Sequence, residues 1–439
     1  MFLGTKKDGT KLELDSKALT THAAVLGSTG SGKSGLIIDI VEELQSEDIP
    51  VILLDIKGDM VNIALQEEYH KVQYLSPGGE HGDAVNVLAN LGDRSRRSAI
   101  VSGLLAMVGE NPDPMNGTHM YLSTVLFYLV DPTIESLIES CLNPEFEYLG
   151  ALPIDDAYPK RRRAALARKL NALLMSPSFE GWTTGQELNL DQIVKQRGVT
   201  IYSVAHLVNE DEQIFAITFL MDELVKWMKK QSGSVEPRLV VAIDECLGLL
   251  PPYPLNPSTK EPILQLLKQA RAFGMGMVLG TQNPVDIDYK ALSNCNTWFV
   301  GRMTAVRDRD KVASAMASLG EFSSSMVSSL ISKLDRRNFL MSSNNELSIF
   351  KTRDTKSKLE GPKTADEVID LYASGHLVYR DAEEYEYEYE YEPEEKQSRI
   401  RELIPEEYEM GAALATVVAL AMYGLIALEI VKEAIEWLR

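Results

Sequence analysis

Short apolar runs alternate with amphipathic stretches along most of the chain. Runs such as "HAAVLG" (22–27) and "PVILLDIKGD" (50–59) have the length and composition of buried strands. Between them, "KSGLIIDIVEELQS" (33–46) repeats its apolar residues at helical spacing. Because strands that alternate with helices form βα units, the pattern predicts an α/β protein with a mainly parallel sheet.

The alternation is interrupted once and then returns. Residues 93–197 have mostly helical patterns broken by Pro and Gly, which predicts a largely helical insertion. Beyond them a helix is predicted over 211–231, and a polar turn between two strand-like runs predicts a hairpin over 338–353. Further strands are predicted at "KVQYLSPGG" (71–79), "GVTIYSVAHL" (198–207), "RLVVAIDE" (238–245), "GMVLGTQ" (276–282) and "TWFVGRM" (297–303).

These patterns divide the chain into five segments. Residues 1–92 and 198–380 are predicted to be the two halves of one α/β core, with 93–197 inserted between them. Residues 381–409 are an acidic low-complexity tract, which we interpret as a solvated linker, and 410–439 are predicted to be a C-terminal helix.

The C-terminal helix has two interpretations. Residues 410–428 contain no charged side chain, and as a helix they would be roughly 28 Å long, close to the thickness of a bilayer core. A membrane contact is therefore one hypothesis. The segment is also rich in alanine and continues amphipathically to residue 439, so packing onto the core or a neighbouring subunit is an equally good one.

The net charge of −20 is unevenly distributed. Residues 381–410 hold 13 acidic and 3 basic side chains, a balance of −10, so the rest of the chain is only mildly acidic. Basic runs at 93–98 and 159–170 keep a nucleic-acid partner open, although a solvated, charge-balanced face is the favoured interpretation of the longer run. The cysteines lack metal or disulfide spacing and no signal peptide opens the chain, so we expect a cytoplasmic protein.

A phosphate-binding motif lies between the first predicted strand and helix. "GSTGSGKS", from Gly27 to Ser34, matches G-x-x-x-x-G-K-[ST], a loop whose backbone N–H groups and helix N-terminus face a bound phosphate. We predict that Lys33 reaches the β- and γ-phosphates of ATP and that the Ser34 hydroxyl ligates Mg²⁺. The residues predicted to bind ATP are Gly27, Ser28, Thr29, Gly30, Ser31, Gly32, Lys33, Ser34 and Gly35.

Acidic residues follow two other predicted strands. Asp244 and Glu245 end the apolar run "LVVAIDE", and we predict that Asp244 holds Mg²⁺ through a water molecule while Glu245 is the general base. Asp55 and Lys57 end "VILLDIKGD", where side chains open into the nucleotide crevice of such folds, although a structural role in a turn is nearly as well supported.

Three further residues are candidates for contacts with the γ-phosphate. Gln282 follows the strand predicted over 276–282 and could sense the phosphate. Arg271, which precedes that strand, and Arg302, which follows the next, could each supply a positive charge to the site of a neighbouring subunit. A surface or salt-bridge role is the alternative for each arginine.

The order of these motifs resembles the HerA/FtsK class of motor ATPases, most closely the HerA-like helicases and ATP-binding proteins. The matching pieces are "GSTGSGKS", "VILLDIKGDM", "VVAIDE", the run from 266 to 303 and "FKTRDTKSKLEGP". The resemblance implies a RecA-like P-loop NTPase core, a hexameric ring, ATP-driven movement along double-stranded DNA and a nuclease partner. By position it implies phosphate and metal binding by Lys33 and Ser34, hydrolysis by Asp244 and Glu245, sensing by Gln282, and Arg271 or Arg302 acting in trans.

Two features depart from the family pattern. About 20 residues precede the P-loop strand, so the N-terminal β-barrel of HerA proteins is not expected, and the acidic tract with its C-terminal helix is additional. They leave two alternatives to a DNA translocase. One is a membrane-tethered coupling or translocation ATPase, and the other is a nucleotide-dependent assembly switch, which the complete set of acid, base and arginine disfavours.

Overall fold

Apolar strands line up side by side at the centre of the fold. The structure is a computed structural model that describes residues 1–378 except 67–71, 80–84, 89–90, 93, 131, 176–181, 183–186, 319–321 and 344–345. Within these ranges, eleven strands form one large sheet. Its order is β2 (Lys11–Glu13), β1 (Phe2–Lys6), β13 (Glu346–Thr352), β12 (Asn338–Ser343), β11 (Thr297–Val300), β3 (Ala23–Leu26), β10 (Phe273–Thr281), β9 (Ser234–Ile243), β4 (Val51–Asp55), β8 (Val199–Ser203) and β5 (Val72–Leu75).

The sheet is parallel from β11 to β5 and antiparallel from β11 to β2. Parallel neighbours need crossover connections, and these are helical: α1 (Lys33–Ser46) follows β3, and α8 (Glu210–Lys230) follows β8. The remaining helices of this part of the chain are α9 (Lys260–Gln269), α10 (Tyr289–Leu292), α11 (Val306–Ser318), α12 (Ser324–Ser332) and α13 (Ala365–Ala373), with short 3₁₀ turns η1 (Ser16–Thr21), η2 (Met60–Ala64), η4 (Ala270–Ala272) and η5 (Pro284–Asp286).

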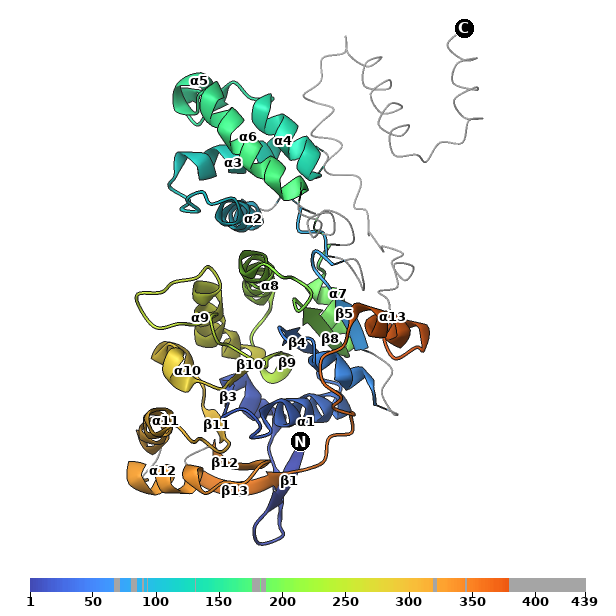
Figure 1. The fold of residues 1–439 in the computed structure, drawn as a ribbon, viewed down its shortest axis with the longest axis vertical. Coiled ribbons are helices and arrows are strands. Elements are labelled where there is room, and N and C mark those ends of the chain that lie inside the picture. The colour runs from blue at the N-terminus through green and yellow to red at the C-terminus, as the bar shows by residue number, and fades with distance from the viewer. Residues whose placement is uncertain are drawn as a thin grey trace. The chain divides into compact units, whose positions relative to one another are not determined.

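Helices cover both faces of the parallel sheet (Figure 1). Neighbouring residues of one strand point to opposite faces, so Val25 joins the hydrophobic cluster that includes α1, and Leu26 joins the cluster that includes α8 and α9. Both faces of the central strands are therefore buried, as expected for a parallel sheet, and the ends of the strands carry the polar side chains.

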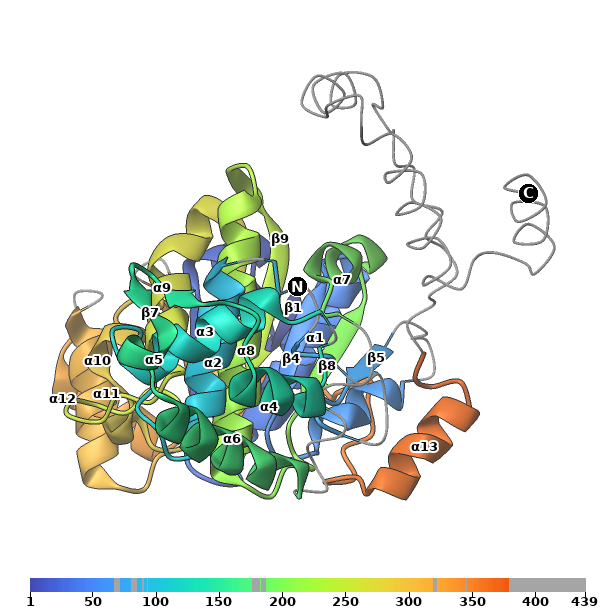
Figure 2. The same ribbon diagram turned by 90° about the horizontal axis from the view of Figure 1, so that it is seen from above.

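The segment between β5 and β8 is largely helical. It contains α2 (Arg94–Met107), α3 (Gly117–Tyr128), α4 (Ile134–Leu142), α5 (Ile154–Ala157), α6 (Lys160–Leu174), α7 (Leu190–Gln196) and the short pair β6 (Tyr148–Leu149) and β7 (Leu152–Pro153). Helix α2 packs on α8, where a Cβ atom at Gly103 would lie 2.0 Å from the Phe215 ring. Helices α3–α6 gather with α2 on the side of the sheet that carries α8 (Figure 1 and Figure 2).

The predicted fold class is confirmed: the chain is an α/β protein with a mainly parallel sheet and a largely helical insertion. The predicted helix 33–46 matches α1, and the predicted hairpin matches β12 and β13. The antiparallel pair β1–β2 was not predicted. The boundaries proposed for the five segments stay predictions.

Two predicted segments, the linker 381–409 and the helix 410–439, lie outside the described residues. Over the part of the chain that the structure describes, no helix is both long and apolar enough to cross a membrane.

Candidate nucleotide-binding site

The P-loop joins β3 to α1 through two glycines in left-handed conformations. Gly30 has a φ of 75° and Gly32, which precedes the first residue of α1, has a φ of 104°. A Cβ atom at Gly32 would also lie 3.1 Å from Cγ of Arg337. Glycine is therefore required at Gly32 both by its backbone conformation and by its close neighbour.

The ammonium group of Lys33 lies against the loop itself. Its Nζ donates to the carbonyl oxygens of Gly27 at 2.7 Å and Ser28 at 3.3 Å. Burial lowers the pKa of Lys33, while the nearby acids Asp244 and Glu245 raise it. The cation thus sits at the P-loop, held by groups that a phosphate could replace.

Ser34 and Asp244 meet across the carboxyl edge of the sheet. The Ser34 hydroxyl donates to the two carboxylate oxygens of Asp244 at 3.2 and 3.1 Å, although the residues are 210 positions apart. Burial and the nearby Asp59 raise the pKa of Asp244, against the opposing charge of Lys57, to about 6. A hydroxyl paired with a carboxylate is the oxygen donor set that Mg²⁺ uses at P-loops.

Glu245 and Lys57 form an ion pair beside this contact. Nζ of Lys57 lies 3.3 Å from Oε2 of Glu245 and 3.9 Å from Oδ2 of Asp244. The second oxygen of Glu245, Oε1, is buried and has no hydrogen-bond partner among the described atoms. A buried acceptor without a partner is uncommon, and here it lies next to the P-loop.

Asp55 has a structural role in the turn that carries Lys57. Its Oδ1 accepts the backbone N–H groups of Lys57 at 3.2 Å and Gly58 at 2.8 Å, and burial raises the pKa of Asp55 to about 7. The structure therefore places Lys57 beside Asp244 and Glu245, and the Asp55 carboxylate fixes the backbone of the turn that carries it.

Gln282 contacts the P-loop directly. Its Oε1 accepts the Thr29 hydroxyl, and the preceding Thr281 carbonyl accepts the N–H of Gly27 at 3.4 Å. A change in the P-loop would therefore reach β10 through two hydrogen bonds.

The two candidate arginines lie at opposite ends of the sheet. Arg302 is exposed beside the P-loop, where its carbonyl accepts the N–H of Ser28 at 3.0 Å. Arg271 precedes β10, whereas Gln282 follows it, so a nine-residue strand, about 30 Å long, separates them. Arg271 cannot reach the P-loop of its own chain.

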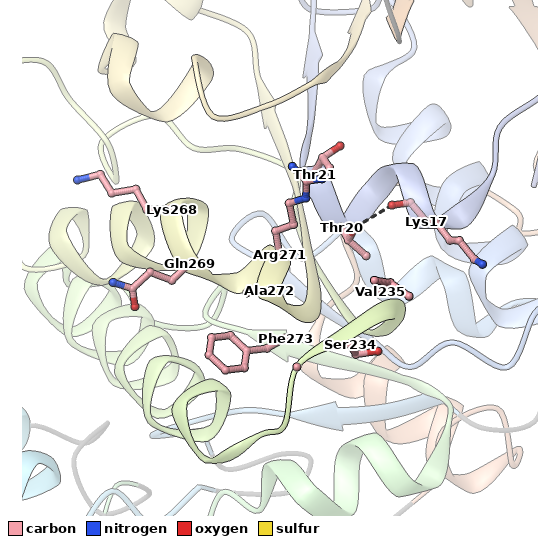
Figure 3. Close-up of a pocket in the computed structure, with 11 residues that line it drawn as sticks. Lys17, Thr20, Thr21, Ser234, Val235, Lys268, Gln269, Arg271, Ala272 and Phe273 are labelled. Carbon is pink, nitrogen blue, oxygen red and sulfur yellow. Dashed lines mark hydrogen bonds between the residues drawn. The ribbon is translucent and has the colours of Figure 1, made fainter.

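Arg271 lines a groove of about 1230 Å³ at the amino end of β10. Figure 3 shows its side chain extending toward Thr21, away from Lys268. Lys17, which also lines the groove, pairs with Glu236 at 2.6 Å. Lys268 and Arg271 are both exposed.

The structure adds two residues that the sequence analysis did not identify. Asp59 lies near Asp244, burial raises its pKa, and its Oδ1 is buried without a hydrogen-bond partner among the described atoms. Arg337 donates its backbone N–H to the Ser31 carbonyl at 2.8 Å. The acid in "KGD" was a usable signal for Asp59, whereas only the fold places Arg337 next to the P-loop.

The residues present fit a magnesium nucleotide. The loop has its glycines in left-handed conformations, Lys33 is at its centre, and Ser34 and Asp244 offer oxygen donors. Among the described atoms, Glu245 and Asp59 each have a buried oxygen without a hydrogen-bond partner, and Asp59 lies close enough to Asp244 to raise its pKa.

Comparisons with known proteins agree with this geometry. The family described as "Helicase HerA, central domain" matches residues 2–224, which is just over half of the 439 residues. The chain belongs to this family. The resemblance to the HerA/FtsK class of motor ATPases is thereby confirmed.

Two curated relatives come from Methanocaldococcus jannaschii. Probable helicase MJECL08 is 24% identical over an alignment of 336 residues, and the alignment covers 72% of this chain and 63% of that protein. Probable helicase MJ1565 is 20% identical over 326 residues, 73% of this chain and 60% of the relative. The matched region thus spans about three-fifths of the length of either relative.

Two solved structures share the fold. VirB4 of Thermoanaerobacter pseudethanolicus aligns with a TM-score of 0.58 and 14% identity over 80% of this chain and 96% of that one. The bacterial conjugative coupling protein TrwB aligns with a TM-score of 0.56 and 14% identity over 83% and 91%. The fold is thus that of RecA-like P-loop NTPases. TrwB has also been solved with ADP and Mg²⁺.

Proposed function

We propose that the protein is an ATP-hydrolysing motor that moves along or unwinds double-stranded DNA as a homo-oligomeric ring. The observation that carries the proposal is the contact of Ser34 with Asp244 at a P-loop whose lysine is already in place. Membership of the HerA family supports the motor function, and the two relatives named as probable helicases support DNA as the substrate. A ring of six subunits and a nuclease partner are parts of this proposal that come from the family resemblance.

In this proposal each site residue at the carboxyl ends of the parallel strands has one role. Lys33 binds the β- and γ-phosphates, and Ser34 with a water held by Asp244 binds Mg²⁺, which when bound neutralises phosphate charge. Glu245 accepts a proton from the attacking water through its free Oε1. Gln282, bonded to Thr29, reports the state of the P-loop to β10. A further positive charge comes from Arg271 of a neighbouring copy, with Arg302 as the alternative.

Helix α6 offers a candidate surface for DNA. Arg163 is buried and paired with Asp155, and Lys169 pairs with Glu110, so these two cations are already neutralised within the chain. Four further cations of this helix are exposed: Lys160, Arg161, Arg162 and Arg168. Lys and Arg side chains facing solvent are what the neutralisation of phosphates requires.

The test is the ATPase rate with and without linear double-stranded DNA, at low and moderate salt, with Lys33→Ala as the control. We expect stimulation by DNA that weakens as salt rises, because phosphate contacts release counterions, and that disappears in the variant. Turnover that ignores DNA would contradict the DNA motor and favour the membrane-tethered coupling ATPase. Nucleotide binding without turnover would favour the assembly switch.

A further inference from the structure

A buried carboxylate fixes the turn that carries Lys57. Asp55 is 1% exposed, and its Oδ1 accepts two consecutive backbone N–H groups, those of Lys57 and Gly58. Gly58 adopts a φ of 81°, which a residue with a side chain rarely takes. Strand β4 lies directly beside β9 in the sheet, so this turn emerges next to the acidic pair that follows β9.

The side chain of Lys57 crosses from the turn to that acidic pair. Among the described residues, the salt bridges of Asp244 and Glu245 are both made by Lys57, at 3.9 and 3.3 Å. The side chain of Lys57 is 38% exposed, whereas those of Glu245 and Asp244 are 11% and 6% exposed. Lys33, the other cation nearby, donates instead to the P-loop carbonyls.

The ion pair makes the two oxygens of Glu245 unequal. Oε2 is held by the ammonium group, and Oε1 is buried with no partner among the described atoms. A general base needs a fixed orientation and one oxygen free for the water whose proton it takes. The contact with Lys57 fixes the orientation of the Glu245 carboxylate and leaves its Oε1 available to the water.

We propose that Lys57 is a positioning residue for hydrolysis: its ammonium group holds Oε2 of Glu245 so that Oε1 faces the attacking water. The inference rests on the proposed ATPase function and deepens it. Lys57 also offsets the repulsion among Asp244, Glu245 and the nearby Asp59 when no metal is bound. The role differs from phosphate binding, which the P-loop provides through Lys33.

The test compares Lys57→Met and Lys57→Arg in the full chain, with basal ATP turnover measured without DNA. Methionine keeps the unbranched shape of the lysine stem but lacks its terminal ammonium group, so we expect kcat to fall about 10- to 100-fold. The KM for ATP and the Kd of an ATP analogue should not rise more than about threefold, since the P-loop contacts to the phosphates remain. Lys57→Arg should recover most of the loss, and Lys195→Met, an exposed lysine on α7, should match the wild type.

A higher KM with unchanged kcat would overturn the inference, because it would mean that Lys57 contacts the nucleotide. An arginine variant no better than methionine would also count against it.

A second readout does not need turnover. Without the internal cation, the acids should respond more strongly to Mg²⁺ alone, so the Mg²⁺-induced rise in Tm should be larger in Lys57→Met than in the wild type or Lys195→Met. Equal shifts in all three proteins would contradict the charge-offsetting role. If the wild-type chain does not hydrolyse ATP, the proposed function fails, while this measurement still tests Lys57.

Discussion

Charged side chains are held in opposite ways at the two ends of the parallel strands. At the carboxyl ends, Lys33 and Lys57 contact neighbouring oxygens, and Ser34 reaches Asp244. At the amino end of β10, Arg271 is exposed in an open groove. The carboxyl ends of the strands thus bring the proposed site residues into contact with one another, whereas the amino end of β10 presents an exposed arginine.

This difference indicates how the protein would work as an assembly. The carboxyl edge of one chain contains the groups that we propose bind phosphate and metal and accept a proton, and the exposed Arg302 lies beside them. The strand between Arg271 and Gln282 keeps Arg271 out of that site. If Arg271 takes part in hydrolysis, a second copy of the chain must bring it.

The largest effect is expected when Arg271, at the amino end of β10, and Lys33, at the carboxyl ends of the strands, are mutated in separate chains. Arg271→Ala should lower ATP turnover about 1000-fold or more, as for other arginines that act in trans. Lys33→Ala should be inactive too. Mixed in equal amounts, the two variants should regain turnover, because the intact P-loop of one can meet the Arg271 of the other.

Two controls make this complementation specific. Arg302 lies beside its own P-loop, so Arg302→Ala mixed with Lys33→Ala should regain nothing if Arg302 acts within one chain. Lys268→Ala changes the neighbouring exposed cation and tests whether any charge in the groove matters. If turnover returns when Lys33→Ala is mixed with Arg302→Ala but not with Arg271→Ala, the arginine that acts in trans is Arg302. The groove at Arg271 would then have no role in hydrolysis.

A smaller effect is expected within the carboxyl edge. Glu245→Gln should lower kcat about 100- to 1000-fold, since the amide cannot accept a proton. ATP binding should persist, because the P-loop contacts remain, and the measurement is the Kd of a fluorescent ATP analogue beside the turnover rate. Glu245 is expected to act on nucleotide bound by the P-loop of its own chain, whereas Arg271 is expected to act on nucleotide bound by a neighbouring chain. Near-normal turnover would point to another base, with Asp59 as the next candidate.

The sequence predicted the parts of the site that depend on local pattern. The P-loop between strand and helix, and the acids ending an apolar run, are motifs of a few consecutive residues, so Lys33, Ser34, Asp244 and Glu245 could be brought together by a parallel sheet. The length of the strand before Gln282 also placed Arg271 at its far end.

What the sequence could not predict depends on contacts between distant positions. The pairing of Lys57 with Glu245 spans 188 positions, and the contact of Arg337 with the P-loop depends on where β12 begins beside it. The sequence around Asp55 was nearly as consistent with a structural role in a turn as with a role in the nucleotide crevice. The hydrogen bonds that its carboxylate accepts from Lys57 and Gly58 favour the role in the turn. Strands β1 and β2 are short and mixed in composition, so their pairing with the sheet edge left no periodic signal.

The smallest effect concerns charge buried on α1 behind the P-loop. Asp39 is fully buried and faces Arg353 at 3.3 Å, with Glu42 and Glu43 nearby on the same helix. Burial raises the pKa of Asp39 to about 8, Arg353 opposes the rise, and Glu42 adds to it. An acid in the unfolded chain has a pKa of about 3.9, so the folded state holds one proton more between about pH 4 and 8, and stability should fall as pH rises through that window.

Asparagine mimics the protonated acid, so Asp39→Asn should remove this dependence. Relative to the wild type, the variant should gain stability as the pH rises from 5 to 8, by on the order of 1 kcal/mol per pH unit, measured as urea midpoints at both pH values. Asp8→Asn is the control, because hydrogen bonds from Thr10 lower the pKa of Asp8, and a lowered pKa affects stability only in more acidic solution. Parallel stability curves for the wild type and Asp39→Asn would mean that Asp39 is ionised throughout. In that case Arg353 balances the buried acids of α1 as Lys57 is inferred to balance those at the carboxyl edge, and the contrast with the exposed Arg271 becomes sharper.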